Sequence, residues 1–181
     1  TGKELSELTI GLIGYSLIGK LVKNLLIAFG CKIIFSDPYV DLTDQDIKDG
    51  VDKVSFENLL KNSDVISIHA RVTKETINLI GEKEIRKMKK GSYLINTARG
   101  PLLDYEALHK ALSDGHLRGA ALDTFYQEPL PENHIFKNLN NVTITPHIAG
   151  ASVKTAYYAA EVIAKDLKNY LDGKELINKI C

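Results

Sequence analysis

The sequence predicts an α/β fold in which a doubly wound, mostly parallel sheet of seven strands is covered by helices on both faces. Short apolar segments alternate with amphipathic helical patterns along the chain, which is typical of this class. Several segments are continuous apolar or β-branched runs, as expected for strands buried on both faces. A polar or charged side chain follows nearly every segment, at the sheet edge where such folds bind ligands.

The composition is typical of a globular protein and excludes several functions. Of the 181 residues, 23 are basic and 23 are acidic, so the formal net charge is zero. Nucleic-acid binding needs a cationic face, and we therefore expect no nucleic-acid partner. No apolar run approaches the roughly 20 residues of a membrane helix. Because there is no signal peptide either, we expect no membrane partner and a cytoplasmic location.

The residue types that commonly bind metals are not arranged as a metal site. Cys31 and Cys181 lack metal-binding spacing and a third ligand. We expect Cys31, at a helix-to-strand junction, to be a reduced structural thiol. The acidic segment 41–49 lacks the spacing of a calcium loop and is interpreted as a solvated loop and helix start. We therefore expect no metal.

The elements are expected in regular alternation. Helical spacing of apolar residues predicts a helix over 17–29, which Gly30 ends. Asp104 is expected to cap a second helix over 105–113. A long apolar stripe predicts a third helix over 152–171. The expected strands are 9–13, 32–35, 51–54, 65–68, 93–96, 118–122 and 142–145.

The first expected strand is followed by a glycine-rich turn. Residues 14–19 read GYSLIG, a dinucleotide-binding fingerprint in which the middle glycine is replaced. Gly14 permits the tight turn, and Gly19 lets helix and strand pack closely. Ser16 places a Cβ and a hydroxyl where the pyrophosphate approaches. That change either crowds the phosphate or gives it a hydrogen bond, and the sequence leaves both outcomes open.

Asp37 ends the second expected strand, 18 residues beyond Gly19. In a dinucleotide-binding fold an acid near this position accepts the ribose hydroxyl hydrogen bonds. A carboxylate there repels a 2′-phosphate, so the cofactor is expected to be NAD and not NADP. The alternative is a simple turn, since Asp37-Pro38 is a common turn starter. The glycine-rich turn upstream favours the ribose role.

Further chemistry-bearing residues follow the later strands. His69 and Ala70 come after the fourth, and Thr97-Ala98-Arg99 comes after the fifth. Asp123 and His147 follow the sixth and seventh. Because the carboxyl ends of parallel strands share one edge of the sheet, we expect a crevice lined by arginine, aspartate and histidine.

Three spaced motifs resemble the NAD-binding domain of the D-isomer-specific 2-hydroxyacid dehydrogenases, a family that includes D-3-phosphoglycerate dehydrogenase. The resemblance runs from Gly2 to about Asn178, nearly the whole chain. It implies a Rossmann fold, an NAD cofactor and oxidoreductase activity. The first motif is 88–91 (MKKG) with 94–100 (LINTARG), the second is 119–123 (GAALD) with 128–131 (EPLP), and the third is 141–142 (NV) with 145–150 (TPHIAG).

The resemblance places the family's catalytic trio on Arg99, Glu128 and His147. Arg99 suits a substrate carboxylate and its C2 oxygen, because a guanidinium is a planar, two-pronged donor. His147 suits proton exchange with the C2 hydroxyl. Glu128 would orient the His147 ring and favour its protonated form. Taken singly, these are a surface arginine, a loop carboxylate and a turn histidine; their joint order favours catalysis.

The cofactor contacts that we expect come from the strand-end positions and from the resemblance. Asp123 resembles the family position that binds the nicotinamide carboxamide. The full expected set is Gly14, Ser16, Leu17, Ile18, Gly19, Asp37, His69, Ala70, Thr97, Ala98, Arg99, Asp123, His147 and Ala149.

The chain departs from the family at three positions. Ser16 replaces a glycine, Leu17 stands where many members have an arginine that reaches the pyrophosphate, and Arg71 stands where proline is usual. A hypothesis follows from the last two departures. Arg71, also at a strand end, would supply phosphate or adenine-side contacts that are lost at Leu17.

The resemblance also predicts the domain organisation. Residues 1–8 are expected to end a helix that connects from a substrate domain, 9–150 to form the NAD-binding domain, and 151–181 to form a helix and tail that return toward the substrate domain. That substrate domain is largely absent from the chain. The resemblance further predicts a homodimer formed through the NAD-binding domain, with 100–103, the following helix and 128–136 at the contact.

The expected function is NAD-dependent hydride transfer at C2 of a D-2-hydroxy or 2-keto acid, with a 3-phosphoglycerate-like acid as one candidate. The isolated chain is expected to bind cofactor and to lack turnover, since its cleft has one wall. An NAD-responsive, co-repressor-like binding module is the alternative. A methyltransferase-like protein is disfavoured, because that class has no need of the Arg99, Glu128 and His147 trio.

Overall fold

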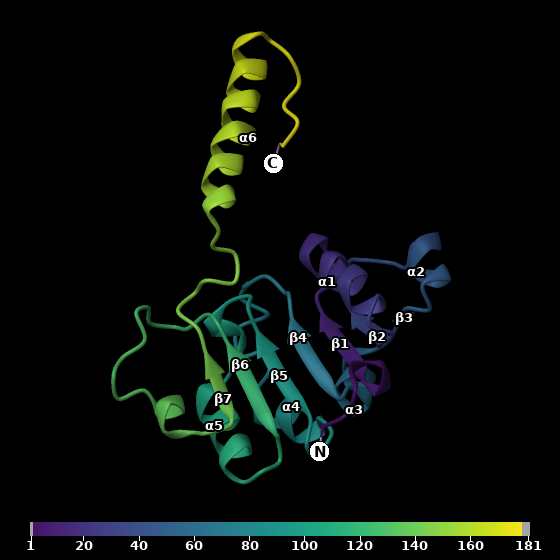
Figure 1. Cartoon of the computed structure of the whole chain (residues 1–181), viewed down its shortest axis with the longest axis vertical. Helices are drawn as coiled ribbons and strands as arrows, with labels where there is room; N and C mark the ends of the chain where they lie inside the picture. Colours follow the sequence, from purple (N-terminus) through teal and green to yellow (C-terminus); the bar gives the residue numbers. More distant parts are fainter. Residues whose placement is uncertain (1, 179–181) are drawn as a thin grey trace. The chain divides into compact units, whose positions relative to one another are not determined.

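The computed structural model describes residues 2–178, which form two compact units that divide between Pro146 and His147. The first unit contains a single sheet in the order β3-β2-β1-β4-β5-β6-β7 (Figure 1). Every neighbouring pair in it is parallel, so the expected doubly wound α/β sheet is confirmed. The strands are β1 (Thr9–Ile13), β2 (Lys32–Ser36), β3 (Asp52–Lys53), β4 (Val65–Ile68), β5 (Tyr93–Asn96), β6 (Gly119–Leu122) and β7 (Val142–Ile144).

The strand order places a topological switch point near the middle of the sheet. The chain runs outward from β1 to β3, returns to β4 on the other side of β1, and continues outward to β7. The order therefore reverses between β1 and β4, whose carboxyl ends are adjacent. Open α/β sheets bind ligands at such a switch point.

Helices of the first unit fill the connections between strands. They are α1 (Leu17–Ile27), α2 (Asp44–Lys48), α3 (Phe56–Asn62), α4 (Glu82–Lys87) and α5 (Tyr105–Ser113), with 3-10 turns η1 (Leu5–Glu7), η2 (Gly100–Leu102) and η3 (Ile135–Asn138). Side-chain oxygens of Thr43, Ser55 and Asp104 cap α2, α3 and α5. The cap expected at Asp104 is thus confirmed.

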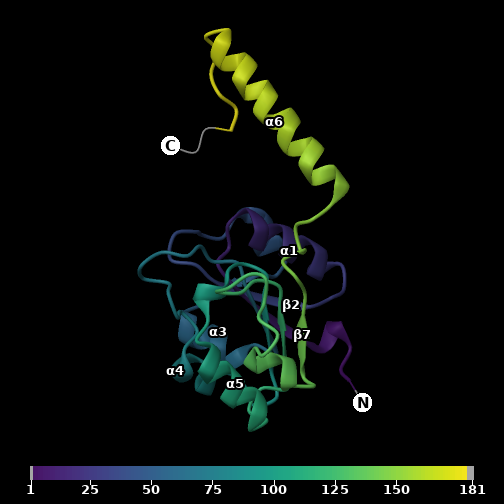
Figure 2. The same ribbon diagram turned by 90° about the vertical axis from the view of Figure 1, so that its left-hand side faces the viewer.

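Two apolar clusters hold the sheet between its helices. The larger one joins β1, β4 and β5 to α3, α4 and α5, which lie together beside the sheet (Figure 2). It includes Leu59 of α3, Ile85 of α4 and Leu108 of α5, all at most 1% exposed. The smaller cluster packs Ile33 and Phe35 of β2 against α1. Cys31 belongs to this smaller cluster as a buried free thiol, and burial raises its pKa. Cys181 lies outside the described residues.

The acidic segment 41–49 is only partly the solvated loop that its composition predicts. Asp44 begins α2 and is exposed, as expected for a helix start. Asp46, however, is 2% exposed and bonds to residues of α1 and its preceding turn. That interpretation was therefore wrong for Asp46, because its partner Lys23 is itself buried on α1.

The second unit consists mainly of α6 (Val153–Leu171), capped by the Ser152 hydroxyl. The helix has the expected bounds to within one residue, and none of its described side chains is buried. Its apolar stripe includes Tyr157, Ile163 and Leu167, all more than half exposed. No helix within residues 2–178 is long and apolar enough to cross a membrane.

Candidate cofactor and substrate site

The glycine-rich turn between β1 and α1 has no room for side chains at its two glycines. Gly14 has φ 87°, and a Cβ there would lie 2.8 Å from backbone atoms of His69 and Ala70. A Cβ on Gly19 would lie 2.5 Å from the Gly14 carbonyl oxygen. Backbone therefore contacts backbone here, and the close packing expected from the sequence motif is present.

The first residues of α1 offer donors and no charge. Ser16 is the N-cap residue, but its hydroxyl makes no capping hydrogen bond to the helix. Leu17 follows with 73% of its surface exposed. Because the first N–H groups of a helix have no partner within it, the exposed start of α1 favours an anion.

Asp37, immediately after β2, is bonded to the glycine-rich turn. Its Oδ2 accepts a hydrogen bond of 2.7 Å from the Tyr15 backbone N–H, and its Oδ1 accepts one of 2.8 Å from the Tyr39 N–H. Each carboxylate oxygen can accept a second hydrogen bond. The carboxylate is therefore held in place with lone pairs left for ribose hydroxyls.

A buried polar network holds the side chain of Tyr15 in the glycine-rich turn, and the sequence analysis did not identify this network. The Tyr15 ring is fully buried and stacks on Phe35 with 3.8 Å between ring centroids. Its hydroxyl donates to Asp46 Oδ1 at 2.7 Å, and Lys23 Nζ lies 3.1 Å from the same oxygen. Lys23 also bonds Asp49 Oδ2 at 2.9 Å.

Charge within this network is stabilised by its partners. Burial alone would raise the pKa of Asp46, but hydrogen bonds from Thr43, Tyr15 and Lys23 outweigh it and hold that pKa well below its usual range. Burial together with the hydrogen bond to Asp46 raises the pKa of Tyr15. Asp46 is therefore a carboxylate and Tyr15 a neutral donor at neutral pH.

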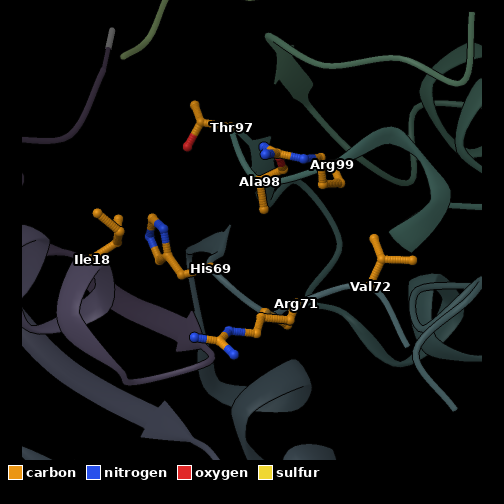
Figure 3. Close-up of a pocket in the computed structure, with 8 residues that line it drawn as sticks. Ile18, His69, Arg71, Val72, Thr97, Ala98 and Arg99 are labelled. Atoms are coloured by element: carbon orange, nitrogen blue, oxygen red, sulfur yellow. The ribbon is translucent and has the colours of Figure 1, made fainter. Parts of the chain in front are cut away.

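A cavity of about 410 Å³ lies at the carboxyl ends of the central strands (Figure 3). Its lining brings together residues that lie far apart in sequence, from α1, from the loop after β4 and from the loop after β5. They are Ile18, His69, Ala70, Arg71, Val72, Thr97, Ala98 and Arg99. Six of these, all but Arg71 and Val72, belong to the expected cofactor contacts.

His69 is a neutral group in this cavity. Burial lowers its pKa below the usual value, because charging the ring there costs solvation. Its Nε2 lies 3.0 Å from the Ser67 hydroxyl. The ring therefore presents a hydrogen-bonding, uncharged surface beside the glycine-rich turn.

The loop that bears Arg99 is shaped by Asn96, a residue that sequence reasoning missed. Asn96 is fully buried at the end of β5. Its Oδ1 accepts from the Ala98 N–H at 3.0 Å, and its Nδ2 donates to the Arg99 carbonyl at 2.9 Å. The side chain of Arg99 is exposed and donates to the Ala98 carbonyl at 2.7 Å.

Asp123 and Glu128 lie on the segment after β6. Asp123 is 3% exposed, and its Oδ1 accepts a hydrogen bond of 2.5 Å from the Thr145 hydroxyl. Glu128 Oε1 accepts from the Phe125 N–H at 2.9 Å. Tyr105 of α5 anchors the same segment, because its hydroxyl accepts from the Tyr126 N–H at 3.1 Å.

His147 and Ala149 belong to the second unit. His147 is its first residue and has φ 54°, a left-handed conformation uncommon for residues other than glycine. The expected pairing of Glu128 with His147 remains a prediction. Within residues 2–178, no group of three or more His, Cys, Asp or Glu side chains is arranged to hold a metal.

The parallel sheet, the glycine-rich turn at its switch point and the carboxylate after β2 define a dinucleotide-binding Rossmann domain. Residues 1–149 match the family described as D-isomer specific 2-hydroxyacid dehydrogenase, NAD binding domain. The chain belongs to this family, and NAD is its cofactor.

Known relatives agree with this assignment. The chain is 44% identical to a glyoxylate reductase of Thermofilum pendens, over 99% of this chain and 54% of that protein. It is 38% identical to a D-3-phosphoglycerate dehydrogenase of Archaeoglobus fulgidus, over 99% of this chain and 34% of that protein. The fold is similar to that of D-lactate dehydrogenase with NAD+ from Lactobacillus jensenii, with TM-score 0.91, 29% identity, and coverage of 100% and 58%. The chain therefore spans about half the length of these relatives, or less.

Proposed function

We propose that this chain is the NAD-binding half of an enzyme that interconverts a D-2-hydroxy acid and its 2-keto acid. One observation carries the proposal. The cavity at the switch point joins the start of α1, His69 and Arg99, and so places a cofactor-binding turn beside a cation suited to a carboxylate. The named activities of the relatives support the same reaction class.

The chain's residues fit the NAD dinucleotide. A Cβ at Gly14 or Gly19 would fill space that the turn needs, and the start of α1 offers N–H donors to a diphosphate. Asp37 would accept hydrogen bonds from the ribose, and Asp123 would bind the nicotinamide carboxamide. When bound, the nicotinamide accepts or donates the hydride.

Arg99 would bind and polarise the substrate. Its guanidinium reaches the cavity from a loop that the buried Asn96 holds in shape. A guanidinium binds a carboxylate through two parallel hydrogen bonds, which fixes the orientation of C2. It also stabilises negative charge that develops on the C2 oxygen during reduction.

His147 and Glu128 would move the proton. His147 takes the hydroxyl proton during oxidation and returns it during reduction. Glu128 would act on His147 and not on the substrate, as a carboxylate that orients the ring and favours its protonated form. Its Oε1 is already positioned by the Phe125 N–H.

For the substrate we propose a short 2-keto acid. Support comes from relatives named glyoxylate reductase, one of which is 44% identical to this chain. A 3-phosphoglycerate-like acid is the second candidate, supported by the more distant relative of that name. Arg99 serves both, since both carry a carboxylate next to the reacting carbon.

The test is turnover by the complete protein that contains this chain. NADH oxidation is measured with glyoxylate, hydroxypyruvate and phosphohydroxypyruvate, and Arg99→Gln serves as the inactive control. The proposal expects reduction of at least one of these acids and its loss in the control. NADH binding without turnover of any 2-keto acid would instead identify a binding module of the co-repressor type.

We also propose a homodimer formed through this domain, as the resemblance predicts. The structure narrows the surface that is available. Leu102, Leu103 and Phe136 are fully buried within the chain and cannot contribute side chains to a contact. The outer faces of α5 and of the segment 128–134 remain. Sedimentation at high micromolar concentration is expected to give a dimer, and a monomer there would contradict the proposal.

A further inference from the structure

The cavity contains a cation that the proposed function leaves unused. Arg71 lies three residues after the end of β4, is exposed, and lines the cavity together with Ile18 and Arg99. Among residues 2–178, no ion pair or side-chain hydrogen bond holds its guanidinium. Arg86, by comparison, is paired with Asp114 at 2.7 Å. Arg71 is therefore available to a ligand of the cavity.

The glycine-rich turn itself brings no cation to the diphosphate that it is shaped to hold. Residues 14–19 are uncharged, and Leu17 exposes an apolar side chain at the start of α1. Lys20 is the first cation along the helix, and its Nζ lies 5.8 Å from the centroid of the Tyr15 ring. A helix N-terminus supplies about half a positive charge, which is less than the two charges of a diphosphate.

The Arg71 loop touches the glycine-rich turn. A Cβ on Gly14 would lie 2.8 Å from the Ala70 backbone nitrogen, and Arg71 is the next residue. Figure 3 shows the Arg71 and Arg99 side chains extending toward the part of the cavity where Ile18 lies, with His69 between the two guanidinium groups in this view. Arg71 thus enters the cavity beside the turn, from a different strand than Arg99.

We propose that Arg71 binds the diphosphate of the dinucleotide across the β1–α1 turn. This inference rests on the proposed function, because it concerns the same cofactor site. The guanidinium is a two-pronged donor that suits phosphate oxygens. A substrate carboxylate is the competing ligand for Arg71. The diphosphate is favoured because the Arg71 loop contacts the glycine-rich turn through backbone atoms, and Arg99 already serves the carboxylate.

Arg71→Met tests the inference, since it removes the charge and keeps an apolar stem. Lys74→Met is the matched control, because Lys74 is an exposed cation of the same loop that does not line the cavity. Dissociation constants are measured by calorimetry on the complete protein for NADH, ADP-ribose and adenosine. Melting temperatures confirm that both variants fold.

Arg71→Met is expected to weaken the binding of NADH and of ADP-ribose about tenfold or more, which is the usual effect of losing a hydrogen bond to a charged group. Adenosine, which has no phosphate, is expected to bind both forms equally. The salt dependence of NADH binding should also become shallower, because one screened ion pair is lost. Lys74→Met should leave all three affinities unchanged.

Other outcomes overturn the inference and are distinguishable from one another. Equal NADH affinity in Arg71→Met and wild type excludes a diphosphate contact while leaving the proposed function standing. The same result with a raised KM for the 2-keto acid assigns Arg71 to the substrate carboxylate. If Arg71→Met weakens the binding of adenosine as much as that of NADH, Arg71 contacts the adenosine part of the cofactor and not its diphosphate. Wild-type protein that fails to bind NADH contradicts the proposed function itself.

Discussion

The carboxylate of Asp37 accepts a hydrogen bond of 2.7 Å from the backbone N–H of Tyr15, which connects the end of β2 to the glycine-rich turn. The side chain of Tyr15 fixes the turn as well, because its hydroxyl donates to the buried Asp46. The glycine-rich turn is therefore fixed through the backbone and the side chain of one tyrosine. Binding to such a preorganised site loses less conformational entropy.

The NAD preference is expected to depend on the charge of Asp37. Asp37→Asn keeps an oxygen that can accept from the Tyr15 N–H and removes the negative charge that repels a 2′-phosphate. We expect the variant to bind NADH more weakly and NADPH more strongly than wild type, so that the difference between the two affinities becomes smaller. Titration of both nucleotides measures this. Wild-type protein that binds NADPH as tightly as NADH would show that Asp37 does not select the cofactor.

The buried ion pair between Lys23 and Asp46 is expected to matter for folding. Their side chains are 4% and 2% exposed, and removing one partner leaves the other charge buried. Lys23→Met should therefore lower the free energy of unfolding by roughly 3–5 kcal/mol, as measured by urea denaturation. Lys53→Met breaks a pair with the exposed Asp41 and should have a far smaller effect. Equal effects of the two variants would contradict this explanation.

His69 is expected to make stability depend on pH near neutrality. Burial lowers its pKa in the folded state, whereas the unfolded chain has the ordinary value of about 6.5. The unfolded state therefore binds the proton more readily. The contribution of the neutral His69 ring to the free energy of unfolding is complete above about pH 6.5. It decreases as the pH falls from there toward the folded-state pKa.

The measurement is the free energy of unfolding between pH 5 and 8 for wild type and His69→Gln. The slope below about pH 6.5 should be shallower in the variant, because the titrating group is gone. Proton NMR of the His69 ring gives a direct check. A ring that titrates above 6.5 would refute the sign of the effect.

Glu128→Gln is expected to change the pH dependence of catalysis in the complete protein. Under the proposed function Glu128 acts on His147, and the substitution removes its charge while keeping its shape. The rate of reduction, which would need a protonated His147, should then decline at a lower pH than in wild type. Oxidation would need the neutral ring and should persist to lower pH. Coincident pH–rate profiles in both directions would mean that Glu128 does not act through His147.

Leu17→Arg is expected to tighten NADH binding. Leu17 is the first residue of α1 and is 73% exposed, so a longer polar side chain fits without displacing the core. A guanidinium there adds a charge beside the diphosphate. The gain should be severalfold at low salt and smaller at high salt, since an exposed charge is screened. Leu17→Gln, which is polar and neutral, is the matched control.

Much of this fold could be predicted because its signals are local. Each expected strand forms within two residues of its expected bounds, since buried parallel strands are apolar throughout. The helices α2, α3 and α4 have only five to seven residues, too few to show helical periodicity, and were not assigned bounds. What identifies them is packing and capping, for example the capping box of Thr43 and Asp46.

The candidate site was predictable in part, because some of its signals are also local in the sequence. Glycines and charged residues at strand ends are visible in the sequence, and six of the expected cofactor contacts line one cavity. The supporting residues are not visible in this way. Asn96 resembles any polar residue at a strand end, and Lys23 resembles any surface lysine on a helix. The role of Lys23 depends on Asp49, 26 residues away, which only the folded chain brings close. The role of Asn96 depends on how the backbone turns at Ala98 and Arg99.

The backbone contact between Gly14 and the His69-Ala70 peptide has a consequence for how this sequence can vary. Gly14 has no side chain at this contact, so the spacing of the two loops there is set by packing of backbone against backbone and does not depend on the side chains at positions 17 and 71. If Arg71 binds the diphosphate as proposed, a cation on either loop would face the same ligand. Positions 17 and 71 should therefore covary among relatives, with an arginine at one position relaxing selection for an arginine at the other.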